Sequence, residues 1–441
     1  MTVKLPRRIL AAISAPAIPV AGLGLPLAVY LPAFYADTVG MGLGAVGTAF
    51  LVARIFDVGV DPLFGFIADR MRPPLGRRRF WLVLSLPILL LSSWMIFLPP
   101  AGAGSLYLLT WILALYLGYT LITISVVSWS AELSGDYDER TRVQTWYQFA
   151  LMVGLIAVLI MPVIVKNGGG DRRAEMAAVG LFIMALLPLC VGFAVIVAPE
   201  ARVHEQPDGH WSAAIAALLR SKPLRIVLAA DFSFGMASGI AATLYIFVIR
   251  DGLLLRGRYN ELLLMFFVVG CLAVPLWMYA ARHFEKHKTM MVAACIHIVA
   301  ALSFFLVPEG NLVALAIVIV LNALPYASAR LLLKSMMADV TDQDRLISGR
   351  MQAGLFFSLL LTTEKLGLAI AVGAAFWTLD AIGFKPGSAD NPQAVRTQLV
   401  EFFVLAPVLF LVLGVVILRF YTLGRARQRE LRAALAGRFG A

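Results

Sequence analysis

Charged residues are scarce in this chain of 441 residues. Lys, Arg, Asp and Glu make up 14% of it and hydrophobic residues 61%, with a mean hydropathy of +0.86. Soluble globular domains carry about 25% charged residues, so this composition excludes that class. Apolar runs of about 20 residues recur along the chain, which is the length that an α-helix needs to cross a bilayer. The composition therefore predicts an integral, multi-pass membrane protein.

Cysteine is rare as well, since only Cys190, Cys271 and Cys295 occur, in apolar segments and without a CxxC pair. The sequence therefore predicts neither a disulfide framework nor a cysteine metal site. The patterns HExxH and GxSxG and the nucleotide-binding P-loop are also absent, which argues against those enzyme classes and against ATP as energy source. We expect no catalysis, no metal and no cofactor, and three cysteines buried for structural reasons.

The formal net charge of +11 does not indicate nucleic-acid binding, because the placement of the basic residues has another explanation. They cluster between apolar spans and lack interleaved aromatic residues, as the positive-inside rule predicts for membrane proteins. The first apolar run follows Lys4, Arg7 and Arg8 and is too long for a cleaved signal peptide, so we interpret it as the first span. The basic stretch 425–438 is partly amphipathic, and we expect it to be attracted to anionic lipid.

Twelve apolar segments fit helical spans. They cover residues 9–35, 44–68, 81–99, 105–131, 144–165, 175–198, 223–249, 259–281, 289–307, 311–338, 349–377 and 398–422. An even number of spans puts both chain ends on one side of the membrane. The excess of Lys and Arg on that side assigns both termini to the cytoplasm, and we expect the inner (plasma) membrane of a bacterium.

The longest predicted cytoplasmic connection divides the spans six and six. A weak repeat supports two related halves, because Ala131-Glu132-Leu133 and Ala338-Asp339-Val340 each follow the fourth span of their half. We therefore expect an all-α membrane protein of two six-helix bundles. The predicted domains are an N-terminal bundle at 1–198, a cytoplasmic linker at 199–222, a C-terminal bundle at 223–424 and a basic cytoplasmic tail at 425–441.

Three charged residues share one face of the second span. Arg54, Asp57 and Asp61 are three and four residues apart, which aligns their side chains on a helix. A charge at mid-bilayer costs roughly 2.5–3.5 kcal/mol on insertion scales, so this face requires partners, water or an ion. We favour a cation or proton site on a transport path; the alternative is an internal Arg–Asp pair that only tolerates burial.

The pattern around this face resembles one family. The residues are Tyr35-x-Asp37-x-Val39-Gly40, Arg54-x-x-Asp57-x-x-x-Asp61-Pro62-x-x-Gly65-x-x-x-Asp69, Asp138-Glu139-Arg140, Ala338-Asp339-Val340 and Lys365. They are similar to the glycoside–pentoside–hexuronide:cation symporters of the major facilitator superfamily, and the resemblance covers essentially the whole chain. The second-span motif is the specific part.

The resemblance implies a coupling site. Asp57 and Asp61 match the family's cation-site carboxylates, Thr120 its cation-site threonine, and Lys365 the lysine that approaches the carboxylates; Arg54 lies on the same face. The coupling ion is H⁺ or Na⁺. Val60 stands where the best-known member has an asparagine, and the loss of an oxygen ligand favours H⁺.

The residues that match the family's sugar-binding set have changed. Ala21 and Thr123 stand where the family has aspartates, and Gln148 where it has an arginine. We therefore expect poor transport of galactosides. Arg330 and Glu364, inside the tenth and eleventh spans, are further candidates for lining the substrate cavity.

Three other ionisable residues lie within predicted spans. Asp231 and His297 lie in the seventh and ninth spans, where hydrogen bonding between helices is the expected role. Lys334 is near enough to the end of the tenth span to reach the interface.

The loop after the second span carries a second resemblance. Asp69, Arg70, Gly76, Arg77 and Arg78 are similar to the loop motif GxxxDRxGRR of the superfamily, with an insertion of about two residues. In the superfamily that loop is a gating latch and contacts no substrate, and the resemblance implies the same role here.

The sequence as a whole predicts a monomeric secondary active transporter. It would carry a small, sugar- or glycoside-like organic solute in symport with a cation or proton by alternating access. Relatives of the family carry lysophospholipids, so a lysolipid or another amphipathic solute is the alternative cargo. A non-transporting sensor or assembly protein on the same fold is the alternative of another class, although such a protein need not keep costly buried charges.

Overall fold

The computed structural model describes residues 5–71, 73–132, 137–199, 221–255, 257–348, 353–388 and 390–424, with 427–428, 430–431 and 433–434. Some helical side chains lie outside the described part of the chain, among them those of Asp61, Asp69, Arg70, Arg77 and Arg330. The predicted linker lies outside it between 200 and 220.

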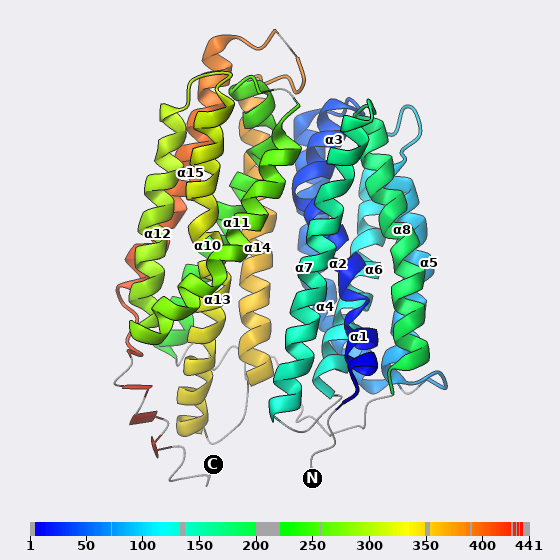
Figure 1. Ribbon diagram of the computed structural model, residues 1–441, viewed down its shortest axis with the longest axis vertical. Coiled ribbons are helices and arrows are strands. Elements are labelled where there is room, and N and C mark those ends of the chain that lie inside the picture. The colour runs from blue at the N-terminus through cyan, green and yellow to red at the C-terminus, as the bar shows by residue number, and fades with distance from the viewer. Residues whose placement is uncertain are drawn as a thin grey trace. The chain divides into compact units, whose positions relative to one another are not determined.

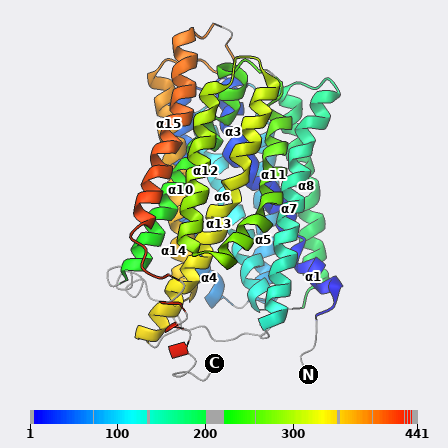
Figure 2. The ribbon, with the colours of Figure 1, turned by 60° about the vertical axis from the view of Figure 1, so that its left-hand side comes forward.

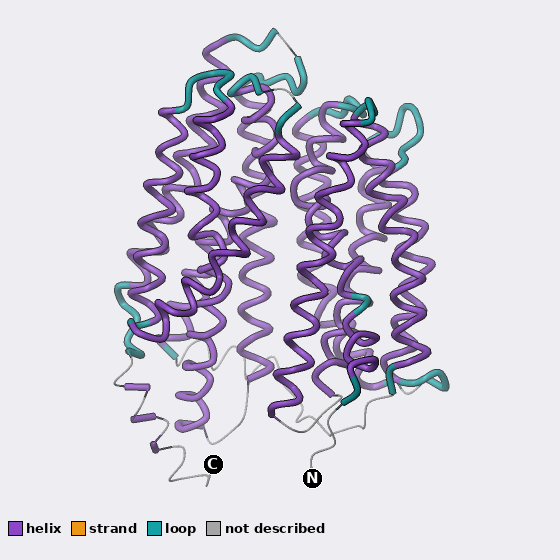
Figure 3. The backbone as a smooth tube through the Cα atoms, in the orientation of Figure 1, coloured by secondary structure: helices purple, strands orange, loops and turns teal. Residues whose placement is uncertain are grey.

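Twelve helical segments of the described chain are long and apolar enough to cross a membrane, which confirms the predicted number. They form two compact units, Met1–Gln206 and Pro207–Ala441. Within each unit the helices run side by side (Figures 1 and 2), and no strand occurs in the described residues (Figure 3).

Unit 1 contains the first six spans. Its elements are α1 (Arg7–Ser14), α2 (Ala17–Leu25), η1 (Pro26–Tyr30), α3 (Leu31–Asp37), α4 (Leu43–Arg70), α5 (Arg77–Phe97), α6 (Ser105–Glu132), α7 (Tyr137–Asn167) and α8 (Arg172–Val197). The first span is interrupted at η1, a π-helical turn that begins at Pro26. Proline has no N–H to donate, so it favours such a change of pitch.

Unit 2 contains the other six spans. Its elements are α10 (Lys222–Phe247), η2 (Val248–Gly252), α11 (Tyr259–His283), α12 (Lys286–Leu302), η3 (Ser303–Leu306), α13 (Leu312–Ser348), α14 (Ala353–Ala381) and α15 (Gln393–Leu418). The seventh span also ends in a π-helical turn, η2. The first span of each unit thus departs from regular α-helix.

Glycines set the closest helix contacts in both units. A Cβ at Gly154 of α7 would overlap the backbone of α2, with the Ile18 Cα at 2.8 Å. In unit 2, a Cβ at Gly367 of α14 would lie 2.8 Å from the Phe232 carbonyl oxygen of α10, and one at Gly239 would lie 3.2 Å from the Leu368 Cα. Small residues let membrane helices approach this closely, and dispersion then stabilises the contact.

The cysteines are less buried than expected. Cys190 is buried, Cys271 is partly exposed and Cys295 is exposed on α12. The expectation of three buried thiols is wrong for Cys295, because an outward-facing position on a membrane helix can be apolar without being packed.

The segment after α15 packs against the other helices of unit 2. Tyr421, Leu423 and Leu431 are buried in its hydrophobic core. The Asp339 carboxylate of α13 pairs with the Lys286 ammonium of α12 at 2.6 Å, and the Gln428 amide donates a hydrogen bond to it. Burial raises the pKa of the Tyr421 hydroxyl, which donates to the Met336 carbonyl at 3.4 Å. Part of the basic stretch expected to face lipid therefore contacts protein.

Lys286→Met should lower the thermal unfolding temperature of the purified protein. It removes the ammonium beside Asp339, whose side chain is 3% exposed. Breaking a buried pair costs about 3–5 kcal/mol, and the partial exposure of Lys286 puts this case at the lower end. The control is Lys288→Met, because Lys288 is 65% exposed in its pair with Glu285 and such pairs contribute at most about 1 kcal/mol. Equal shifts of the unfolding temperature for both variants would contradict a stabilising buried ion pair between Lys286 and Asp339.

Candidate functional site in unit 1

Asp57 lies on α4 with 1% of its surface exposed. The Thr120 hydroxyl of α6 donates a hydrogen bond of 3.1 Å to its Oδ1 atom. The two residues come from neighbouring helices, since α4 packs against α6. Two of the predicted coupling residues thus meet within one compact unit. The side chain of Asp61, one turn further along α4, lies outside the described part of the chain.

Arg54 lies one turn before Asp57 and contacts an aromatic ring that the sequence did not single out. Its guanidinium carbon is 4.9 Å from the centre of the Tyr116 ring. Tyr116 is 1% exposed and lies one turn before Thr120 on α6. A cation over an aromatic face gains about 0.5–2 kcal/mol, more where water is excluded. The ring therefore gives Arg54 a defined position beside the buried carboxylate.

Val60 and Lys365 were also discussed in the sequence analysis of the coupling site. Val60, where an oxygen ligand is missing, is 8% exposed on α4. Lys365 is half-buried on α14 and belongs to unit 2. Its approach to Asp57 stays a prediction. No cluster of His, Cys, Asp and Glu side chains able to hold a metal ion occurs among the described residues.

The predicted substrate-lining residues are distributed over three helices of unit 1 and two of unit 2. Ala21 on α2 and Thr123 on α6 are half-buried, and Gln148 on α7 is exposed. Glu364 is half-buried on α14 and lines a cavity of unit 2. Arg330 belongs to α13, but its side chain lies outside the described part.

The predicted gating loop has one described backbone feature of note. Gly76 precedes α5 with φ +100°, a conformation that other residues rarely adopt. Arg78 is 2% exposed. The side chains of Asp69, Arg70 and Arg77 lie outside the described part of the chain.

Arg79, next in the arginine run, was not predicted to have a role. Its guanidinium donates a 2.6 Å hydrogen bond to the Ala198 carbonyl and lies 6.0 Å from the centre of the Trp129 ring. The Trp129 indole donates to the Pro199 carbonyl at 2.9 Å. Together they fix the end of α8, where the predicted linker starts. The sequence feature that could have predicted this contact is the run Arg77-Arg78-Arg79 at the start of α5.

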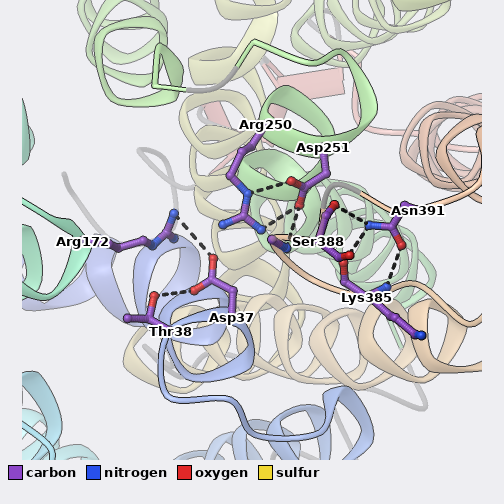
Figure 4. Close-up of polar contacts among 9 residues, drawn as sticks. Asp37, Thr38, Arg172, Arg250, Asp251, Lys385, Ser388 and Asn391 are labelled. Atoms are coloured by element: carbon purple, nitrogen blue, oxygen red, sulfur yellow. Dashed lines mark hydrogen bonds and ion pairs between the residues drawn. The ribbon is translucent and has the colours of Figure 1, made fainter.

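Each unit also has an ion pair where its first span ends, and Figure 4 shows both. In unit 1 the Asp37 carboxylate lies 3.7 Å from the Arg172 guanidinium of α8 and accepts a 2.6 Å hydrogen bond from the Thr38 hydroxyl. In unit 2 the Asp251 carboxylate pairs with Arg250 at 2.7 Å. Sequence reasoning used Asp37 only as part of a family motif.

Comparison with known proteins gives one family and several relatives. The model of a family described as MFS/sugar transport protein matches residues 12–425. A protein of Escherichia coli whose name describes a glycoside/cation symporter is 26% identical over 91% of this chain and 89% of its own. The mouse sodium-dependent lysophosphatidylcholine symporter 1 is 24% identical over 93% and 85%.

A solved structure has the same fold. It is that of a bacterial homologue of the human lysosomal transporter Spinster, in an inward-facing, unoccupied conformation. It covers 98% of this chain and 99% of its own, with a TM-score of 0.68 and 14% identity. At that identity the similarity concerns the fold alone.

Proposed function

The chain belongs to the MFS/sugar transport protein family, whose members are membrane transporters and not enzymes, and we propose that it is a cation- or proton-coupled symporter of a small organic solute. The solute is sugar- or glycoside-like, and alternating access of the two units carries it across the membrane. The protein acts as a monomer in a bacterial inner membrane with both termini in the cytoplasm. Asp69, Arg70, Gly76, Arg77 and Arg78 form its gating latch.

The observation that carries this proposal is the burial of Asp57. A carboxylate within a membrane span costs roughly 2.5–3.5 kcal/mol, and one hydrogen bond from Thr120 at 3.1 Å offsets about 1.5–3 kcal/mol of that. A protein that needs only a stable helix has no reason to keep the charge. A transporter does, because a buried carboxylate binds H⁺ or a cation strongly enough to bias the conformation.

The coupling site consists of Asp57, Asp61, Thr120, Arg54 and Lys365. In the empty site, the two basic groups balance the carboxylates. An entering cation replaces that positive charge, and Arg54 has the Tyr116 ring, 4.9 Å away, to hold its guanidinium. Val60 offers no oxygen, and Na⁺ prefers several oxygen ligands, so the site favours H⁺.

The relatives and the altered lining residues support the choice of candidate solutes. A glycoside/cation symporter and a lysophosphatidylcholine symporter are similar to the chain at nearly equal identity, so a lysolipid is the second candidate. Ala21, Thr123 and Gln148 lack the charges that would hold a galactoside.

Uptake into reconstituted vesicles tests both candidates. The panel contains a galactoside, a pentoside, a hexuronide and lysophosphatidylcholine, each with an imposed pH or Na⁺ gradient. We expect gradient-driven accumulation of the pentoside or another non-galactoside glycoside, and at least tenfold less of the galactoside, because an unmatched polar set discriminates strongly. Efficient galactoside accumulation would contradict the assigned lining. Accumulation of lysophosphatidylcholine alone would select the second candidate. If the imposed gradients drive accumulation of no compound in the panel, a sensor or assembly protein is favoured.

A further inference from the structure

Three ionisable side chains from three helices of unit 2 line one cavity inside the membrane-spanning part. Asp231 comes from α10, His297 from α12 and Glu364 from α14, and the cavity has a volume of about 60 Å³. Asp231 is 7% exposed, and its carboxylate accepts a 2.7 Å hydrogen bond from the Thr363 hydroxyl. Ionisable residues inside membrane spans are costly and mark ion paths and proton relays.

The size and chemistry of the cavity restrict its ligand. Organic ligands occupy pockets of about 300–1,000 Å³, so this cavity admits only water and small ions. Two carboxyl groups exclude an anion. Among the described residues, no group of His, Cys, Asp and Glu side chains is arranged to hold a metal ion. A proton does not require several side chains to meet at one point, because water can relay it between groups that are not in contact.

The two serine hydroxyls of the cavity lining donate their hydrogen bonds within their own helices. The Ser238 hydroxyl donates to the Gly235 carbonyl at 3.3 Å, and the Ser328 hydroxyl donates to the Pro325 carbonyl at 2.6 Å. Both donors are thus used within their own helices. A cavity of this size holds a few waters, each of which needs two to four polar partners, and the carboxyl and imidazole groups supply them.

We propose that this cavity is a second proton-binding site, in which water connects the Asp231 carboxylate with His297 and Glu364. It lies entirely within unit 2, whereas Asp57 lies in unit 1. The site therefore stands whether or not Asp57 couples transport. Its ligand is H⁺ alone.

Four of the five helices that line the cavity carry titratable groups at or next to its lining, and α15 does not. The titratable or charged groups on these helices near the cavity are Asp231 on α10, His297 on α12, Tyr326 and Lys334 on α13, and Glu364 and Lys365 on α14. The lining residue of α15 is Leu411, which is apolar. Arg330 is also on α13, and its side chain lies outside the described part. Of these groups, Asp231, His297, Glu364 and Tyr326 line the cavity itself, whereas Lys334 and Lys365 are not among the lining residues.

Infrared difference titration of the purified full-length protein in lipid nanodiscs tests the proposal. Spectra are recorded between about pH 8 and about pH 5, the range in which histidine also titrates. The protein carries Asp57→Asn and Asp61→Asn as a background. That background removes the unit 1 carboxylates, so a failure of the transport proposal does not affect the result. We expect a carboxyl C=O band of a buried acid to appear on acidification, to disappear in Asp231→Asn or Glu364→Gln, and to shift in His297→Gln.

Glu309→Gln is the matched control, because Glu309 is 48% exposed outside the cavity, and its substitution should leave the band unchanged. A band unaffected by Asp231→Asn, Glu364→Gln and His297→Gln would overturn the proposal, as would a signal that depends on Na⁺ and not on pH. If Asp231→Asn does not fold, as judged by gel filtration, the Glu364 and His297 variants decide by the same criterion.

Discussion

Asp57→Asn should abolish concentrative uptake while the protein remains folded in the membrane. One charge that moves inward with the solute gains about 2.3 kcal/mol per 100 mV, which corresponds to an accumulation of about 50-fold at 1.4 kcal/mol per factor of ten. Asparagine preserves the volume and the hydrogen bond from Thr120 but binds no proton or cation strongly. The variant should therefore equilibrate its solute to about the same concentration on both sides. The measurement is uptake into vesicles at an imposed gradient, normalised to folded protein.

Two further variants make this result specific. Glu401→Gln removes an exposed carboxylate from α15 and should accumulate solute as the unmodified protein does. Thr120→Val removes the 3.1 Å hydrogen bond to Asp57, worth about 1.5–3 kcal/mol at a charged group, and should reduce accumulation without abolishing it. Undiminished accumulation by Asp57→Asn would show that coupling takes place elsewhere.

Gly154→Ala should strongly destabilise unit 1. The added Cβ would overlap the backbone of Ile18, which cannot rotate away as a side chain can. Overpacking costs typically 1–3 kcal/mol, and a backbone clash between helices α2 and α7 belongs at or above the upper end. Thermal unfolding and the yield of monodisperse protein in detergent measure the effect.

Gly192→Ala is the matched control. Gly192 also lies within a membrane helix, α8, and a Cβ there meets nothing within 4 Å. Alanine is the better helix former by about 1 kcal/mol, so the control should be neutral or stabilising. A similar loss of stability in both variants would mean that α2 and α7 do not pack as described.

The twelve spans were predictable because hydropathy alone selects apolar stretches of bilayer length. Their ends were not, since polar residues can extend a helix beyond the bilayer: α13 continues to Ser348, ten residues past the predicted end of its span. A proline such as Pro26 predicts a break or bend in its span, but the π-helical form of the turn there was not predictable, because proline does not specify the kind of break.

The parts of the candidate site that lie on one helix were predictable from the sequence. The contacts between different helices were less predictable. The spacing of Arg54 and Asp57 placed them on one face of α4, and only the family resemblance pointed to Thr120. Spacing did not predict the Tyr116 ring beside Arg54, because nothing in a single sequence indicates which face of α6 meets α4. The same holds for Asp231, His297 and Glu364, which are more than 60 residues apart and meet only through tertiary packing.

The central claim is that a buried carboxylate of unit 1 couples solute transport to ion transport. The most direct test is to measure ion entry that is driven by the solute. Vesicles that contain the protein and an internal pH indicator receive an inward gradient of the accumulated solute, with no imposed pH, Na⁺ or electrical gradient. Internal acidification in step with solute entry, absent from Asp57→Asn vesicles, is the predicted result. Solute entry without ion movement, or equal acidification with Asp57→Asn, would contradict the account.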